Sequence, residues 1–194
     1  MSDAPTMRAF CACNPDVASV RRLVETQAAL RAHPLAPKAR WVSPTRMHVT
    51  LKFFGDVDVG LAPALSDAIS PLARDERTIR VGYAGLTGFP DADRARVVVA
   101  LLDDAPGEVR RIAEGVEAAT GKLGFEREAR EFLPHVTLAR LERPSDVSAW
   151  LASVRLPAPP VTLTELVLYR SDLGSARHEY VALSRFGMGS MHEE

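Results

Sequence analysis

The sequence predicts an α+β fold of two pseudo-symmetric, mostly antiparallel sheets with outer helices and a central cleft. Stretches rich in β-branched and aromatic residues alternate with stretches of helical periodicity along the whole chain. Two of the expected strands are followed directly by another strand, which favours antiparallel pairing. One tetrapeptide also recurs almost half a chain apart, which indicates two similar lobes.

The first half of the chain predicts the order strand, helix, strand, helix. A buried strand over residues 8–13 precedes a helix that begins with the cap and proline of residues 14–16. A loop then leads to a strand over residues 47–54. The helix that follows carries apolar residues at helical spacing, namely Leu61, Leu65, Ile69 and Leu72. Pro71 is expected to end or bend this helix.

The middle of the chain predicts a hairpin and a third helix. Strands over residues 78–86 and 96–102 flank a turn-rich stretch over residues 88–93, which we expect to be an exposed loop. Asp104 is expected to cap the helix. Its apolar face consists of Val109, Ile112, Val116 and Ala119.

The last part of the chain predicts a further strand, a short helix and a closing strand pair. The strand covers residues 135–141 and the helix residues 145–151. The closing strands cover residues 162–170 and 179–186, and residues 187–194 are expected to form a flexible tail. We expect residues 1–194 to form a single domain of two interleaved lobes.

Composition limits the class of protein. Apolar residues make up 46% of the chain and charged residues 25%, which is typical of a globular protein. The net charge is −1 and the pI is about 6.5, so any contact with RNA must be local rather than driven by an overall positive field. Two cysteines, no visible secretory signal and no apolar run of membrane-spanning length predict a cytoplasmic protein without a membrane segment.

The recurring tetrapeptide is His-Val-Thr-Leu, at residues 48–51 and 135–138. Side chains alternate along a strand, so His48 and Thr50 share one face of the first copy, and His135 and Thr137 share one face of the second. If a pseudo-two-fold axis relates the lobes, both faces converge on one cleft. That cleft would offer two imidazoles and two hydroxyls around a central point.

This set of groups suits the displacement of a phosphodiester. The reaction needs a base that takes a proton from the nucleophile and an acid that protonates the departing oxygen. Two histidines supply both roles near neutral pH, so we expect no metal and no cofactor. Threonine hydroxyls can bind the non-bridging phosphate oxygens.

Phe53 and Arg140 stand five positions after His48 and His135, at equivalent places in the two copies. An aromatic ring and a guanidinium at these places could sandwich a base. Strict alternation puts both on the face opposite the histidines, so a bulge, a strong twist or a strand end must redirect them. For Phe53, simple packing in the core is an equally good interpretation.

The residues around both copies resemble the two-histidine phosphoesterases, and within them the bacterial and archaeal RNA 2′,3′-cyclic phosphodiesterases, also named 2′-5′ RNA ligases. The resemblance lies in Arg-Ala-Phe at residues 8–10, Trp-Val at 41–42, the segments at 47–55 and 132–140, and Leu-Val-Leu-Tyr-Arg-Ser at 166–171. It implies a bilobal fold and hydrolysis of a terminal 2′,3′-cyclic phosphate to a 2′-phosphate. In that reaction His48 would protonate the 3′ oxygen, His135 would activate water, and Thr50 and Thr137 would hold the phosphate. One departure is the valine run at 97–99, where relatives often carry a tryptophan.

Three other functions stay open at this stage. A ligase would run the same chemistry backward and join a cyclic end to a 5′-hydroxyl. A second alternative acts on small cyclic phosphates derived from ADP-ribose, and a third is a nucleotide-binding module without turnover. In each case the expected partners are RNA ends or small cyclic-phosphate nucleotides, bound by a monomer.

Overall fold

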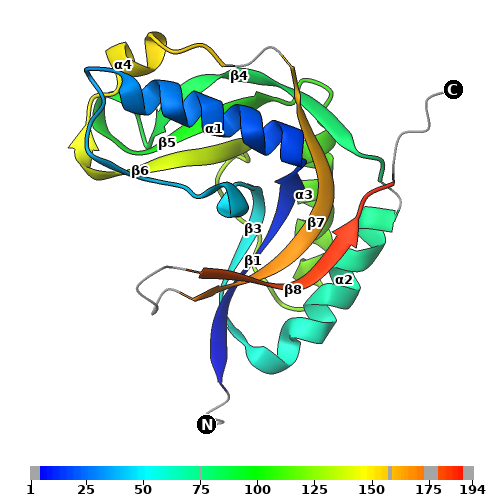
Figure 1. Ribbon diagram of the computed structural model, residues 1–194. Helices are drawn as coiled ribbons and strands as arrows, with labels where there is room; N and C mark the ends of the chain where they lie inside the picture. The colour runs from blue at the N-terminus through cyan, green and yellow to red at the C-terminus, as the bar shows by residue number, and fades with distance from the viewer. Residues whose placement is uncertain (1–4, 75, 157–158, 173–178, 190–194) are drawn as a thin grey trace, which may run out of the picture.

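The computed structural model describes residues 5–74, 76–156, 159–172 and 179–189 and confirms the predicted α+β fold (Figure 1). In chain order its elements are β1 (Thr6–Pro15), α1 (Val17–Ala32), β2 (Ala39–Trp41), β3 (Val49–Asp58), α2 (Ala62–Arg74), β4 (Ile79–Phe89), β5 (Ala95–Asp103), α3 (Glu108–Gly121), β6 (His135–Ser145), α4 (Ser148–Ala152), β7 (Val161–Asp172) and β8 (Glu179–Gly187). None of the helices in the described ranges is both long and apolar enough to cross a membrane.

The strands form two halves that are hydrogen-bonded into one eight-stranded sheet. One half contains β3, β1, β7 and β8, and the other contains β2, β6, β5 and β4. The halves join at two places, where Val49 of β3 pairs with Val136 of β6 and where β4 pairs with the first residues of β7. All pairings between these strands are antiparallel, as expected, but the two predicted sheets are continuous with each other.

The helices cover one face of each half (Figure 1). Helices α2 and α3 pack against the first half, where α2 contacts β7 and β8 and α3 contacts β3. Helix α1 lies across the second half, and its Gln27 donates a hydrogen bond to the Leu138 carbonyl of β6 at 2.8 Å. Trp150 of α4 in turn donates to the Leu30 carbonyl of α1 at 3.0 Å. Most of the buried apolar side chains of both halves form one continuous cluster, and a second, smaller cluster consists of Phe10, Ala12, Val167 and Tyr169.

Helix boundaries differ from the sequence prediction at two prolines. Pro15 is the last residue of β1, and α1 begins only after Asp16, whose carboxylate accepts a hydrogen bond from the Ser19 N–H at 2.7 Å. Pro71 was expected to end or bend this helix, and it lies inside α2, which continues to Arg74, so the helix does not end at this proline. A proline in the last turn of a helix removes only one backbone hydrogen bond, and the packing of α2 on the sheet outweighs that loss.

The expected loop at 88–93 and the expected tail at 187–194 each begin with strand residues, and one short strand was not predicted. Phe89 belongs to β4, although it falls in the expected loop at 88–93. The expected tail at 187–194 is ordered at its start, because Gly187 ends β8, Met188 is buried and Gly189 donates to the Glu76 carbonyl at 2.9 Å. Residues 190–194 lie outside the described residues. Strand β2 was not predicted, since three residues are too few to show a pattern.

Candidate active site

The two His-Val-Thr-Leu segments lie side by side in the sheet. Val49 pairs with Val136 in antiparallel register, and both valines are buried in the core on the helix-covered side. Side chains alternate along a strand, so the residues on either side of each valine point to the other side of the sheet. We call this side, which carries His48 and His135, the histidine face.

Each histidine makes the same hydrogen bond to the backbone two residues before it. Nδ1 of His48 lies 2.8 Å from the Arg46 carbonyl oxygen, and Nδ1 of His135 lies 2.7 Å from the Leu133 carbonyl oxygen. A carbonyl oxygen can only accept, so Nδ1 carries the proton in each neutral imidazole. Nε2 is therefore the basic nitrogen of both side chains.

The two threonines occupy equivalent positions on this face. The Thr50 hydroxyl lies 3.1 Å from Nε2 of His48 and donates to it in the tautomer that the Arg46 carbonyl selects. Thr137 is half-buried beside Val99 of β5. Extending the antiparallel register by one residue from the valine pair places each threonine next to the histidine of the other copy.

Burial lowers the pKa of both imidazoles. It lowers the pKa of His48 to about 4, against the opposing effect of the bond to the Arg46 carbonyl. Positive charge on His135 when it is protonated, and on Arg46 and Arg140, lowers this pKa further. Burial likewise lowers the pKa of His135. In the free protein both imidazoles are therefore neutral at neutral pH, and an anion bound between them would favour their protonation.

A phenylalanine stands beside each histidine. The ring of Phe10 in β1 lies 5.0 Å from the His48 ring, and the ring of Phe89 in β4 lies 5.0 Å from the His135 ring, edge to face. Phe10 also stacks on Tyr169 at 5.1 Å and meets the edge of Tyr180 at 5.0 Å. These rings form an apolar wall next to the imidazoles. In the sequence, Phe10 stood out only as part of a resemblance, and Phe89 fell in an expected loop.

A β-bulge in the first copy turns Phe53 to the histidine face. Successive residues of β1 pair with Thr50 and then with Lys52, which leaves Leu51 without a partner of its own. One extra residue reverses the alternation beyond it. Phe53 pairs with Phe10, their ring centres are 5.8 Å apart, and the Phe53 side chain is 67% exposed. Phe53 is therefore not a core residue.

The second copy has the same bulge at the same position. Successive residues of β5 pair with Thr137 and then with Ala139, which leaves Leu138 as the extra residue. Arg140 therefore points to the histidine face, where it is exposed and pairs with Val97. The redirection that strict alternation required is thus present in both copies.

Phe53 and Arg140 lie on opposite sides of the site. The strands are antiparallel at the Val49–Val136 pair, so the residues that follow each valine run in opposite directions. The sandwich of one base between these two side chains stays a prediction. The same register brings Leu133, which is 47% exposed, to the Phe53 end. One end of the site is therefore apolar and the other carries Arg140.

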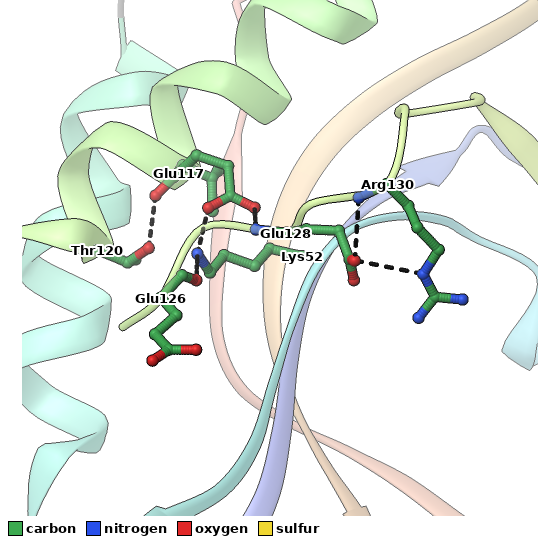
Figure 2. A network of polar contacts seen from close by, with 7 residues as sticks. Lys52, Glu117, Thr120, Glu126, Glu128 and Arg130 are labelled. Carbon is green, nitrogen blue, oxygen red and sulfur yellow. Dashed lines mark hydrogen bonds and ion pairs between the residues drawn. The ribbon is translucent and has the colours of Figure 1, made fainter. Parts of the chain in front are cut away.

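Lys52 fixes the segment that leads to the second histidine, a role that no pattern in the sequence indicated. Its side chain is buried on the helix side and forms an ion pair with Glu117 of α3 (Figure 2). It also donates to the Glu126 carbonyl at 2.7 Å, and the Glu117 carboxylate accepts from the Glu128 N–H at 3.3 Å. Glu128 in turn pairs with Arg130. The segment that begins at Glu126 is therefore anchored to β3 and α3 at its start.

Known proteins resemble the chain in sequence and in fold. The family model described as the 2′-5′ RNA ligase superfamily matches residues 15–175. An Aeropyrum pernix protein named RNA 2′,3′-cyclic phosphodiesterase is 36% identical over 124 residues, which cover 64% of this chain and 69% of that protein. An Aquifex aeolicus protein of the same name is 29% identical over 104 residues, which cover 53% of this chain and about half (55%) of that protein. The crystal structure of TT0787 of Thermus thermophilus has a TM-score of 0.77 and 26% identity, and the match covers 96% of this chain and 100% of that chain.

Proposed function

The chain belongs to the 2′-5′ RNA ligase superfamily, and on this premise we propose that it hydrolyses the terminal 2′,3′-cyclic phosphate of RNA to a 2′-phosphate. The pairing of Val49 with Val136 carries the assignment, because it brings two histidines whose basic nitrogen is Nε2 to one face. The relatives from Aeropyrum pernix and Aquifex aeolicus are both named RNA 2′,3′-cyclic phosphodiesterase, which supports the choice of substrate.

The reaction is an in-line displacement at phosphorus. Nε2 of His135 takes a proton from water, whose oxygen attacks the phosphorus. The bond from phosphorus to the 3′ oxygen breaks, and the proton on Nε2 of His48 moves to that oxygen. A 2′-phosphate and a free 3′-hydroxyl result, and solvent returns the two histidines to their starting protonation states.

His48 must be protonated to serve as the acid, although its pKa in the free protein is about 4. The negative charge of the bound phosphate supplies the missing stabilisation of the imidazolium. Protonation of Nε2 also removes its capacity to accept the hydrogen bond from Thr50. The Thr50 hydroxyl is then free to donate to a non-bridging phosphate oxygen, and Thr137 does the same from the other copy.

The two ends of the site hold different parts of the substrate. Phe53 stacks on the terminal base, with Leu133 at the same end. Such stacking accepts any base, which suits an enzyme that acts on RNA ends rather than on a sequence. Arg140 contacts phosphate, because a guanidinium donates two parallel hydrogen bonds to phosphate oxygens.

The protein works as a monomer in the cytoplasm. Both histidines come from one chain, so a monomer holds a complete site. Cys11 and Cys13 are free and buried, and burial raises the pKa of Cys11 to about 12. Thiols of this kind are inert core residues, which suits a protein of the reducing cytoplasm.

The test is the reaction itself on a short RNA that ends in a 2′,3′-cyclic phosphate. Chromatography against synthetic standards separates the 2′-phosphate, the 3′-phosphate and any 2′-5′ joined product. Formation of the 2′-phosphate alone is the expected result. A 3′-phosphate would reverse the assignment of the leaving oxygen, and joined RNA as the main product would make the chain a ligase.

A further inference from the structure

We propose that Arg40 and Arg140 form a second phosphate site, which binds a phosphodiester group within the RNA while the two histidines hold the cyclic phosphate. The inference rests on the proposed function and deepens it. It makes Arg40 a specificity-determining residue that distinguishes the end of an RNA chain from a single cyclic nucleotide. Arg40 lies in β2, the strand that the sequence did not predict.

The register of β2 places the two arginines side by side. Arg40 pairs directly with Arg140, and the next pair along is Trp41 with Ala139. Trp41 meets the ring of Trp150 in α4 at 6.3 Å, so the Trp41 side of β2 faces the helices. Neighbouring residues of a strand point to opposite sides, and Arg40 and Arg140 therefore both lie on the histidine face.

Two like charges opposite each other in adjacent strands repel. Directly opposed side chains have Cβ atoms only about 5 Å apart, and like charges at that separation destabilise the pair. Both arginines are exposed, and neither forms an ion pair or hydrogen bond with another side chain in the described part of the chain. Glu142 lies two residues beyond Arg140 and, among the described residues, forms no ion pair with either guanidinium. A bound phosphate would relieve the repulsion.

The arginine pair lies between the active site and a basic hollow. Arg140 is close enough to His48 to lower the pKa of that histidine. In the other direction along β2 and β6, a hollow of about 320 Å³ is lined by Lys38, Glu142, Arg143 and Ser145. Basic groups thus continue outward from the histidines along one edge of the sheet. In a chain whose net charge is −1, such a local strip is where an RNA strand would bind.

The test compares substrates that differ in one phosphate. A nucleoside 2′,3′-cyclic phosphate contains only the reacting group, whereas a dinucleotide with a 2′,3′-cyclic end adds one phosphodiester. Arg40→Gln should lower kcat/KM for the dinucleotide roughly tenfold, the usual effect of losing one charged hydrogen-bonding contact. The loss should appear in KM, because Arg40 does not touch the reacting phosphate. Activity on the mononucleotide should not change.

A matched control removes the same charge elsewhere. Arg21 lies exposed on α1 without an ion pair among the described residues, so Arg21→Gln should leave both substrates unaffected. Arg40→Lys should restore part of the dinucleotide activity, since it keeps the charge but not the paired donors. Raising the salt concentration should weaken dinucleotide binding less in Arg40→Gln than in the parent.

The outcomes distinguish failure of the second phosphate site from failure of the proposed function. An equal loss on both substrates, or no loss on either, would overturn the second phosphate site. If the parent turned over neither substrate, the proposed function would fail, and Arg40 would be judged on calorimetric binding of a dinucleotide with a terminal 2′-phosphate. Tighter binding of that ligand to the parent than to Arg40→Gln supports the site, and equal binding rejects it.

Discussion

Val49 pairs with Val136 in antiparallel register, and this one contact joins the two copies of the His-Val-Thr-Leu segment. Each valine is buried on the helix side, so the flanking histidines and threonines are placed on the other side. The bulge at the fourth residue of each copy then turns Phe53 and Arg140 to that side as well. A single antiparallel pairing and two equivalent bulges thus generate the whole site.

The protonation of His48 should depend on a bound anion. In the free protein its pKa is about 4, chiefly because the imidazole is buried. Inorganic phosphate between the histidines should raise this pKa, since it places negative charge beside the imidazolium. NMR titration of the ring carbons, with His48→Gln for assignment, measures the change. An identical titration with and without saturating phosphate would remove the explanation offered for the acid role of His48.

The same pKa makes the stability of the fold depend on pH. The unfolded chain binds a proton at His48 below about pH 6.5, whereas the folded protein does so only near pH 4, so the free energy of unfolding falls as pH falls between these values. Protonation of His48 in the unfolded chain accounts for about 3 kcal/mol of this fall in the free energy of unfolding. Chemical denaturation at a series of pH values should therefore show a shallower decline in His48→Gln than in the parent. Parallel curves for the two proteins would contradict the lowered pKa.

Phe53 and Phe54 should respond oppositely to replacement by alanine. Phe53 is 67% exposed on the histidine face, whereas Phe54 packs against the core and meets the ring of Phe125 at 5.2 Å. Phe53→Ala should raise KM roughly tenfold through lost base stacking, with little change in the free energy of unfolding. Phe54→Ala should cost about 2 kcal/mol of stability and leave KM nearly unchanged. A destabilised Phe53→Ala with normal KM would make Phe53 a packing residue.

Removal of one partner from the buried ion pair of Lys52 and Glu117 should lower the free energy of unfolding. Lys52→Met leaves the Glu117 carboxylate buried without its partner and should destabilise the fold by about 3 kcal/mol. The double change Lys52→Met with Glu117→Gln should recover part of that loss. Hydrogen exchange should increase in residues 126–130, which the pair anchors. Additive losses in the double variant would show that the two side chains do not act as a pair.

The sequence predicted most elements and the pairing of the two histidines on one face because both rest on local patterns. Strand alternation, helical spacing and a repeated tetrapeptide can be recognised in the sequence alone. The pairing of the strands, which sets the direction of Phe53 and Arg140, depends on neighbours distant in sequence. The relative placement of Phe53 and Arg140 was not predictable for this reason, since the residues that follow the valine pair run in opposite directions along the two antiparallel copies.

Other features left no pattern to recognise. Strand β2 has only three residues and takes its place through pairing with β6, so the position of Arg40 next to Arg140 was not predictable. Lys52 looks like any polar residue of a half-exposed strand, yet α3 covers it and supplies Glu117 as its partner. Helix α2 continues through Pro71 because tertiary packing outweighs local propensity.

The most direct test of the central claim is the single-turnover rate of hydrolysis of a 2′,3′-cyclic RNA end, with chelator present, by the parent, His48→Gln, His135→Gln and the double variant. Because both histidines act in one transition state, each single change should lower the rate by about a thousandfold, and the double change should lower it little further. Circular dichroism should show that all four proteins are folded. A folded variant that lacks either histidine and keeps the parent rate would contradict the paired acid and base.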